Sequence, residues 1–341
     1  MKYNDKASIN LKNSKQCKKL ILDKTKNKNK SNGHNNLFQF YMALLIFLFP
    51  YLIVKVTSVK FPEHFDLRLK YSQCKSLFFV RNQEKCGGCW AFATAEAISD
   101  LICINTEGEK QPFISETELI TCCEQCFNKT NKIRGCSGGY VGQAFKYWVN
   151  NGLPSGGLYG DENACKPFPF KEKEEIDGGK LKCVENCQDG SKPVLIKGSD
   201  YRFLPKRNEI EMMREIYYNG PVVASLDIYD DFNDYWENNC RGIYQYNSYA
   251  PKNGSHSVKI IGWGSEIIDR KTVKYWICVN SWGVNKCDGI FKIRKGEDEC
   301  QIESWVKAGY IDSETLITTD ESIVVLENQF FSFKNLNKDY R

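Results

Sequence analysis

Histidine is scarce in this chain, which contains only three among its 341 residues. His34 lies in a lysine-rich segment near the N-terminus, and His64 lies just before the first helix expected in the folded region. Chemistry that needs an imidazole as a base is therefore limited to very few positions. His256 is the strongest candidate among them.

A net positive charge is also lacking once the first 36 residues are set aside. Residues 1–36 carry ten lysines and two aspartates, a charge of +8, and because the whole chain carries +5 the remainder carries about −3. Such a remainder offers no strong basic footprint for nucleic acid, so we expect no nucleic-acid partner. The segment 1–36 itself is rich in Lys and Asn and poor in apolar residues, which predicts a basic disordered tail.

Only one long apolar stretch occurs, the 18 residues 37–54, and a glutamine and a proline interrupt it. As a membrane anchor it is barely long enough, whereas a signal peptide fits better if translation starts at Met42 and cleavage occurs near Ser58. We therefore predict a signal peptide or signal anchor at 37–58, and the later start would leave residues 1–41, including the tail at 1–36, untranslated. Both alternatives export the rest of the chain, so we expect a lysosomal or extracellular protein. It would contact a membrane only through 37–54, if that stretch is retained.

Cysteine, by contrast, is abundant, with 16 residues in the chain. Such heavy use is unusual for a cytosolic protein and indicates an oxidising compartment, in agreement with export. Spacing alone does not determine which cysteines pair.

The most informative run is Gln-Glu-Lys-Cys-Gly-Gly-Cys-Trp-Ala-Phe, residues 83–92. Apolar residues at helical spacing predict a helix from Cys89 to about Ile104, with the thiol at its N-terminus. Unpaired amides and the helix dipole there favour the thiolate, and a nearby cation can lower a cysteine pKa from about 8.5 to roughly 3.5–7.5. Cys89 is thus the candidate nucleophile. Taken alone, Cys86-x-x-Cys89 fits a thioredoxin-like redox pair or half of a zinc site equally well.

A cysteine nucleophile needs a base, and His256 precedes an apolar run, Val258–Ile261, that predicts a strand with the imidazole at its start. Asn280 follows 24 residues after His256. Its side-chain carbonyl can accept a hydrogen bond from one ring nitrogen, which would fix the tautomer and leave the other nitrogen for the thiol.

With Gln83 placed six residues before Cys89, the order Gln, Cys, His, Asn resembles that of the papain and cathepsin family of cysteine peptidases. The resemblance implies catalytic roles for Cys89, His256, Asn280 and Gln83, the last forming an oxyanion hole with the backbone N–H of Cys89. It also implies a papain-like α+β fold of two domains, a helical half and a β-barrel-like half, with the active-site cleft between them. Gly88 departs from the family, which has Ser or Ala at this position.

Further matches narrow the resemblance to the cathepsin B branch and extend it over residues 61–310. They lie in residues 97–104, 121–123, 135–140, 152–159 and 300–304. We therefore predict a peptidase domain at 59–310 and a C-terminal extension at 311–341, to which the sequence assigns no function.

The same resemblance implies residues that contact the substrate. Gly138 and Gly139 would let an extended substrate backbone approach closely, because they carry no side chain. Trp282 would shield the histidine and asparagine from water. Trp305 aligns with an acidic residue that admits arginine into the cathepsin B pocket for the second residue before the scissile bond. A bulky apolar base at that place predicts a preference for small or moderately sized apolar side chains and discrimination against cationic ones.

Resemblance to cathepsin B also implies five disulfides and leaves Cys89 free. The implied pairs are Cys74 with Cys103, Cys86 with Cys136, Cys122 with Cys183, Cys123 with Cys126, and Cys165 with Cys187. Cys240 has two candidate partners for an additional bridge, Cys278 and Cys287, and the sequence does not choose between them.

Residues 166–180 depart from cathepsin B, whose long occluding loop carries its own disulfide and two histidines that bind a substrate's terminal carboxylate. Here the segment contains neither His nor Cys. We therefore predict a shortened, open loop and an endopeptidase with weak or absent carboxydipeptidase activity. Lys166, Lys171 or Lys173 remain alternatives for binding a carboxylate, although such a Lys/Glu run is typical of a solvated surface.

We expect no metal and no cofactor. The expected partners are peptide or protein substrates and cystatin-type inhibitors. Two other hypotheses remain: a catalytically inactive papain-fold protein that binds peptides, and a Cys-x-x-Cys oxidoreductase in which Cys86 bonds to Cys89.

Overall fold

In the computed structural model of this chain, residues 60–127 and 133–312 are described. The predicted tail at 1–36, the predicted signal segment at 37–58 and nearly all of the extension at 311–341 lie outside them, so those assignments stay predictions. Within the described part of the chain, no helix has both the length and the apolar character needed to cross a membrane.

The described residues include six α-helices and eight strands of very different length, joined by long irregular segments. The helices are α3 (Leu67–Lys70), α4 (Cys89–Asn105), α5 (Glu116–Cys122), α6 (Val141–Asn151), α7 (Glu209–Tyr218) and α8 (Asp231–Asn238). The strands are β1 (Phe65–Asp66), β2 (Asp200–Phe203), β3 (Val222–Tyr229), β4 (Ile243–Tyr244), β5 (Lys252–Ile268), β6 (Lys271–Val279), β7 (Ile290–Arg294) and β8 (Val306–Tyr310). Single 3-10 turns lie at Lys75–Phe78, Arg134–Cys136, Gly178–Lys180, Cys287–Gly289 and Glu299–Gln301.

One sheet contains these strands, in the order β2-β8-β3-β5-β6-β7-β4, and β1 pairs with β5. The long strand β5 pairs antiparallel with both β3 and β6, and this register sets His256 opposite Leu226. The predicted strand at Val258–Ile261 is therefore longer than its apolar run indicates, and His256 lies inside β5 instead of at its start. The polar residues that open β5 are held by their pairing with β3.

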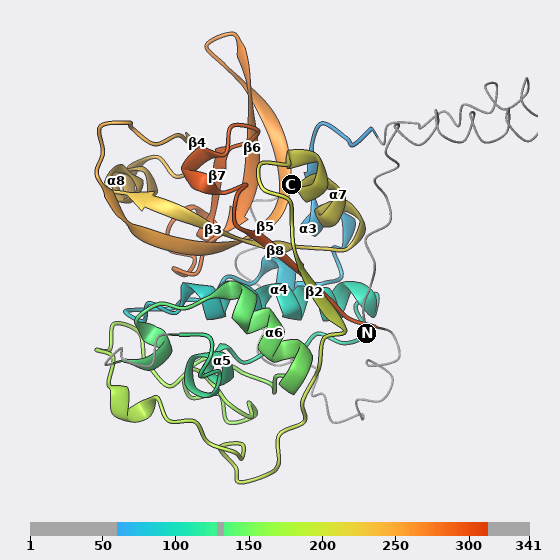
Figure 1. Ribbon diagram of the computed structural model, residues 1–341, viewed down its shortest axis with the longest axis vertical. Helices are drawn as coiled ribbons and strands as arrows, with labels where there is room; N and C mark the ends of the chain where they lie inside the picture. The colour runs from blue at the N-terminus through green and yellow to red at the C-terminus, as the bar shows by residue number, and fades with distance from the viewer. Residues whose placement is uncertain (1–59, 128–132, 313–341) are drawn as a thin grey trace, which may run out of the picture. The chain divides into compact units, whose positions relative to one another are not determined.

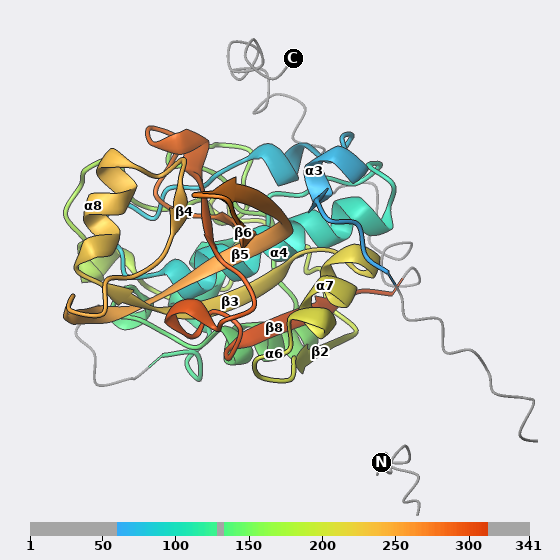
Figure 2. The same ribbon diagram turned by 90° about the horizontal axis from the view of Figure 1, so that it is seen from above.

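The core consists of two buried apolar clusters, and residues of α4 belong to both. Figure 1 shows α4 between the sheet and the helices α5 and α6. One cluster consists mainly of side chains from α4, α5 and α6. The other consists mainly of side chains from the sheet together with those of α7 and α8 that pack on it. This arrangement confirms the α+β architecture with a helical half and a strand-rich half. Figure 2 shows α4 running beside β5 and β3, so the central helix belongs to both halves.

The helix α4 is buried on almost every side. All of its residues from Trp90 to Ile104 are buried, and the helix ends at Asn105, one residue beyond the predicted end. Its N-cap, Gly88, provides no side-chain hydrogen bond. In the first turn the backbone of Trp90 hydrogen-bonds the thiol of Cys89, while the N–H of Ala91 donates to the carbonyl of Gly88 at 2.8 Å.

All five disulfides implied by the cathepsin B resemblance are present among the described residues. A sixth joins Cys240 to Cys287, which answers the choice that the sequence left open. Cys278, the other candidate, lies buried in β6 as a free thiol. Cys89 is free and half-buried.

A cluster of buried charges joins α4 to β5. The Nζ of Lys259 lies 2.7 Å from Asp100 Oδ2 and 3.8 Å from Glu96 Oε2, and none of the three side chains is more than 3% exposed. The backbone N–H of Arg81 donates to Glu96 Oε1 at 3.0 Å, and the Arg81 guanidinium pairs with Glu116. Each of these carboxylates thus faces a positive or N–H partner from the fold itself.

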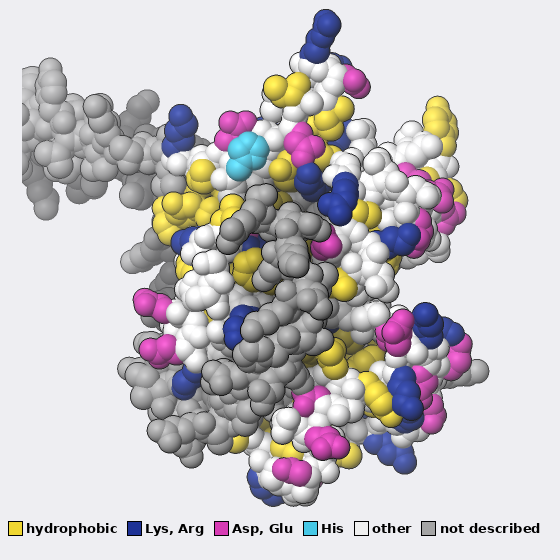
Figure 3. Space-filling model, turned by 180° about the vertical axis from the view of Figure 1, so that it is seen from behind, with side chains coloured by type: hydrophobic (Ala, Val, Ile, Leu, Met, Phe, Trp, Pro, Cys, Tyr) yellow, Lys and Arg dark blue, Asp and Glu magenta, His cyan; other side chains and the backbone are white. Residues whose placement is uncertain are grey.

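Charge on the outer surface is mixed. On the face shown in Figure 3, Lys and Arg side chains lie among Asp and Glu side chains, with apolar side chains between them. No broad region of one sign dominates the described surface on this face, as expected from the nearly balanced charge beyond the first 36 residues.

Candidate active site

Cys89 and His256 come from different halves of the fold and meet across the cleft. Cys89 is the first residue of α4, and His256 projects from β5 with only 5% of its surface exposed. A hydrogen bond between the two side chains contributes to the pKa of each. The pairing of a helix N-terminus with a strand therefore assembles a thiol and an imidazole that lie 167 residues apart in the sequence.

Asn280 orients the imidazole. Its Oδ1 lies 2.8 Å from His256 Nε2 and also accepts the backbone N–H of Ser281 at 2.8 Å. A carbonyl oxygen can only accept, so Nε2 carries a proton, and the hydrogen bond to Cys89 uses Nδ1. Asn280 is fully buried immediately after β6, behind the histidine and away from the cleft.

The charges of the cysteine and the histidine stabilise each other. Burial alone would raise the pKa of the Cys89 thiol, but the charge of His256, its hydrogen bond and backbone hydrogen bonds with Ser257 and Trp90 lower it below the ordinary value. Burial alone would lower the pKa of His256, but Cys89 and Asn280 raise it above the ordinary value. Both directions favour a thiolate beside an imidazolium.

Gln83 lies beside the thiol with its carboxamide held at both ends. Its Nε2 donates to the carbonyl of Cys86 at 2.7 Å, and its Oε1 accepts the hydroxyl of Ser281 at 2.5 Å. The two backbones also pair, because the N–H of Gln83 donates to the carbonyl of Ser281 at 2.8 Å. One N–H of the carboxamide remains for an oxygen in the cleft. The sequence interpretation missed Ser281, and its position directly after Asn280 was the available signal.

Trp282 covers the histidine. Its ring centroid lies 5.1 Å from that of His256, and Phe232 and Trp236 hold the indole from the other side in edge contacts of 5.8 and 5.5 Å. Trp282 is only partly buried and also lines the cleft. The ring is therefore placed between solvent and the hydrogen-bonded side chains behind it.

A single cleft of about 1010 Å³ brings together seven of the eight predicted catalytic and substrate-contacting residues. They are Gln83, Cys89, Gly138, Gly139, His256, Trp282 and Trp305. The eighth, Asn280, lies behind the histidine. The lining is largely apolar with a few convergent polar groups, which is typical of a small-molecule or peptide site.

Glycine is present at positions 138 and 139 for different structural reasons. A side chain at Gly139 would meet the Trp90 indole at 2.3 Å, so packing on Trp90 requires glycine there. Gly138 has a φ of +96° and nothing within 4 Å of the place of its missing Cβ. The backbone at Gly138 is therefore open on the side of the cleft, as a docking strand would need.

Trp305 lines the cleft but is not its buried floor. Its ring is 44% exposed, and the Nζ of Lys206 lies 3.7 Å from the ring centroid. The buried side chain that reaches the same cleft from β8 is Lys307, with 6% exposed. The sequence interpretation missed Lys307, although it lies only two residues after Trp305.

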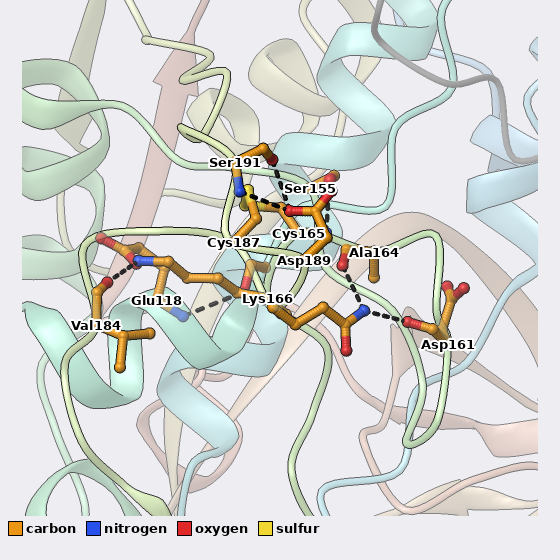
Figure 4. Close-up of a disulfide and its surroundings, with 12 residues drawn as sticks. Glu118, Ser155, Asp161, Ala164, Cys165, Lys166, Val184, Cys187, Asp189 and Ser191 are labelled. Carbon is orange, nitrogen blue, oxygen red and sulfur yellow. Dashed lines mark hydrogen bonds and ion pairs between the residues drawn. A yellow bond between two sulfur atoms is a disulfide. The ribbon is translucent and has the colours of Figure 1, made fainter.

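The segment 166–180 lies outside the residues that line the cleft. Lys166, one of the proposed carboxylate ligands, is buried at the Cys165–Cys187 disulfide, where it pairs with Glu118 and donates to the carbonyl of Val184 (Figure 4). Lys166 is therefore part of the fold and cannot bind a substrate. Further along, the N–H of Lys173 donates to Glu84, which holds the segment against the chain beside Gln83.

Comparison with known proteins agrees with this geometry. The family described as papain family cysteine protease matches residues 61–310. The chain is 39% identical over 263 residues to a gut-specific cysteine proteinase of Caenorhabditis elegans, with 75% of each protein covered. It is 36% identical over 269 residues to a cathepsin B-like cysteine proteinase of Schistosoma japonicum, with 74% of each covered.

Solved structures show the same likeness. A procathepsin B from Trypanosoma congolense superposes with a TM-score of 0.63 at 33% identity, covering 75% of this chain and 79% of the other. Bromelain from Ananas comosus, solved in complex with the inhibitor E64, superposes with a TM-score of 0.53 at 25% identity, covering 74% of this chain and all of the other.

Proposed function

Because the chain belongs to the papain family of cysteine proteases and is cathepsin B-like, we propose that it is a catalytically active endopeptidase. The observation that carries this proposal is the complete hydrogen-bonded series from Cys89 through His256 to Asn280, with Gln83 beside the thiol. A pseudoenzyme that only binds peptides would not need the thiol pKa to be lowered or the imidazole pKa to be raised.

The proposed reaction is acyl transfer in two steps. The thiolate of Cys89 attacks the peptide carbonyl, and the carbonyl oxygen takes the negative charge beside the free N–H of Gln83 and the N–H of Cys89. The imidazolium of His256 gives its Nδ1 proton to the leaving amine as the C–N bond breaks. Water then attacks the thioester with His256 as base, which releases the acid and regenerates the thiol.

The pH dependence follows from the same ion pair. The rate should rise as pH passes the lowered pKa of Cys89, because the thiolate is the nucleophile. It should fall as pH passes the raised pKa of His256, because the leaving amine then receives no proton. The optimum should lie between these two pKa values, and we propose that it falls at mildly acidic pH under reducing conditions.

Endopeptidase action is supported by the position of the segment 166–180. It contributes no residue to the cleft lining, it contains no histidine, and Lys166 is engaged inside the fold. We propose on this basis that a substrate chain extends past the thiol without meeting a group that requires its free C-terminus. We also propose export to a lysosome or the cell exterior, where cystatin-type inhibitors would compete for the same cleft.

A redox function is less well supported. An oxidoreductase would cycle a Cys86–Cys89 disulfide, whereas Cys86 is bonded to Cys136 and Cys89 is free. The backbone around this bridge is also fixed, because the N–H of Gly87 donates to the carbonyl of Cys136 at 2.9 Å.

The experiment is cleavage of an internally quenched peptide, blocked at both ends, by the full-length protein produced through a secretory pathway. Cleavage at pH 5.5 with reductant, lost in a Cys89→Ala variant, is the expected result. Failure of the wild-type protein to cleave it and to react with a thiol-directed peptidyl epoxide would favour the inactive peptide-binding alternative. Much faster cleavage of a peptide with a free C-terminus than of its amidated twin would contradict the endopeptidase assignment.

A further inference from the structure

Lys307 is a buried cation that faces the cleft. It lies on β8, where it is opposite Phe203 of β2 and Val223 of β3, and 6% of its surface is exposed. Its Nζ lies 5.7 Å from the ring centroid of Phe203 and 5.9 Å from that of Trp305. Both of these aromatic residues also line the cleft, so the ammonium is set between two aromatic walls.

The ammonium of Lys307 has no carboxylate partner within the described chain. Its one hydrogen bond there runs from Nζ to the carbonyl of Trp305 at 2.9 Å, which leaves two of its three hydrogens without an acceptor. Burial, with a contribution from Lys206, lowers the pKa of Lys307 to about 8. The side chain is still charged at acidic and neutral pH.

The fold does not need this lysine for the contact that it makes. The carbonyl of Trp305 already accepts the backbone N–H of Ser225 at 3.0 Å, so it would stay satisfied without the ammonium. Asp227 is the acidic residue that lines the same cleft, and it is engaged by Lys252 at 2.8 Å and by the side-chain amide of Gln301. A buried charge without a partner is costly, which indicates that its partner arrives with a ligand.

The surroundings favour an anion. Lys206 lies over the Trp305 ring, and Lys146 lines the cleft from α6, so two further cations lie near Lys307, while the carboxylate of Asp227 is already paired with Lys252. Trp305 directly precedes β8, Lys307 lies within it, both line the cleft, and the Nζ of Lys307 lies 5.9 Å from the ring centroid of Trp305. They therefore belong to one subsite, which the cathepsin B resemblance assigns to the second residue before the scissile bond.

We propose that Lys307 is a specificity-determining residue that selects substrates with a carboxylate side chain, Glu or Asp, at the second position before the scissile bond. This inference rests on the proposed peptidase function. It changes the expectation of an apolar preference at this position, and it keeps the discrimination against cationic side chains. The aromatic walls of Phe203 and Trp305 would pack on the methylene groups of the acidic side chain.

The test compares two quenched peptides that differ only in Glu or Gln at this position, because the pair has equal size and differs in charge. At pH 5.5 the full-length enzyme should cleave the Glu peptide with a kcat/KM about tenfold higher, as one charge-assisted hydrogen bond would give. The ratio should fall toward one as pH rises through about 8, where Lys307 loses its proton.

Two variants make the assignment specific. Lys307→Met should bring the Glu to Gln ratio close to one, and this ratio is the readout because the variant changes the cleft lining for both peptides alike. Lys146→Met is the matched control, since it removes an exposed cation of the same cleft, and it should keep most of the ratio. A wild-type ratio of one, a ratio that persists in Lys307→Met, or a preference that appears only at the third position would overturn the proposal.

The proposal remains testable if the protein cleaves neither peptide. In that case the peptidase function fails, and binding of fluorescently labelled Glu and Gln peptides to the Cys89→Ala variant is measured by anisotropy. A Kd about tenfold lower for the Glu peptide, lost on adding Lys307→Met, supports the acidic subsite independently of catalysis. Equal Kd values overturn it.

Discussion

Two lysines of the same sheet are almost fully buried, and their surroundings differ completely. Lys259 on β5 is 0% exposed and lies between Asp100 and Glu96 of α4. Lys307 on β8 is 6% exposed, faces the cleft and has no carboxylate partner in the described chain. Both strands pair with β3, so the two ammonium groups are held by the same framework.

The presence or absence of a carboxylate partner distinguishes a lysine that stabilises the fold from one that we propose to bind a ligand. Lys259 is compensated from within, and its ion pairs fix the helix that carries Cys89 against the strand that carries His256. Lys307 is surrounded by aromatic rings, which attract a cation without carrying a charge, and by another lysine, so no negative charge faces it among the described residues. Removing the ammonium of Lys259 should therefore lower the stability of the fold, whereas removing that of Lys307 should change substrate preference and leave stability nearly unchanged.

The largest effect is expected for Lys259→Met. It leaves Asp100 buried without a cationic partner, and breaking a buried ion pair in this way costs about 3–5 kcal/mol. The measurement is the free energy of unfolding from urea denaturation at pH 7, with the disulfides kept oxidised. Cleavage should fall as well, because the contact between α4 and β5 positions the thiol against the imidazole.

The control for this prediction is the double variant Lys259→Met with Asp100→Asn. Removing the second charge should recover a large part of the loss, since an uncharged amide is less costly to bury than a carboxylate. If Lys259→Met alone unfolded at the same urea concentration as the wild type, the ion pair would not be the structural element described here.

A smaller effect of opposite sign is expected for Glu96→Gln, which should raise the free energy of unfolding at pH 7 by about 2 kcal/mol. Burial raises the pKa of Glu96 from 4.5 to about 6, against the opposing charges of Lys259 and Arg81. Between pH 4.5 and 6 the native state holds a proton that the unfolded state has lost, so this group stabilises the fold at low pH and loses that contribution as pH rises. Glu96→Gln should therefore be more stable than the wild type at pH 7.

The sharp readout is the difference in unfolding free energy between Glu96→Gln and the wild type as a function of pH. It should be near its full value above pH 6 and shrink toward pH 4.5, whatever other groups titrate in both proteins. Asn105→Asp, a change at an exposed residue at the end of the same helix, serves as a control for charge effects. A difference that does not vary between these pH values would contradict the raised pKa.

Sequence alone predicted those elements whose signal is local. The apolar spacing after Cys89 predicted α4 to within one residue, and the apolar run Val258–Ile261 indicated the buried middle of β5. The order of Gln, Cys, His and Asn indicated the site because a family resemblance assigned their roles. Resemblance, not spacing, implied the five disulfides.

What the sequence could not show depends on pairing between distant segments. The first residues of β5, from Lys252 to Ser257, are mostly polar and exposed, so no apolar pattern marks them, and β3 holds them in the sheet. The hydroxyl of Ser281 has meaning only once the chain at residues 81–83 lies beside it. Lys307 in β8 resembles an ordinary solvent-facing lysine until the fold turns that face toward the cleft.

The smallest effect on stability is expected for Lys307→Met, and it completes the contrast with Lys259. Methionine keeps the length of the side chain and its contacts with Phe203 and Trp305, while it removes a buried charge that has no carboxylate partner. The free energy of unfolding should change by less than about 1 kcal/mol, and its sign should be an increase, because an unpaired buried charge is removed. Urea denaturation beside Lys259→Met gives the comparison directly. A loss as large as that of Lys259→Met would mean that Lys307 is compensated within the fold, and its role in selecting an acidic substrate would lose its physical basis.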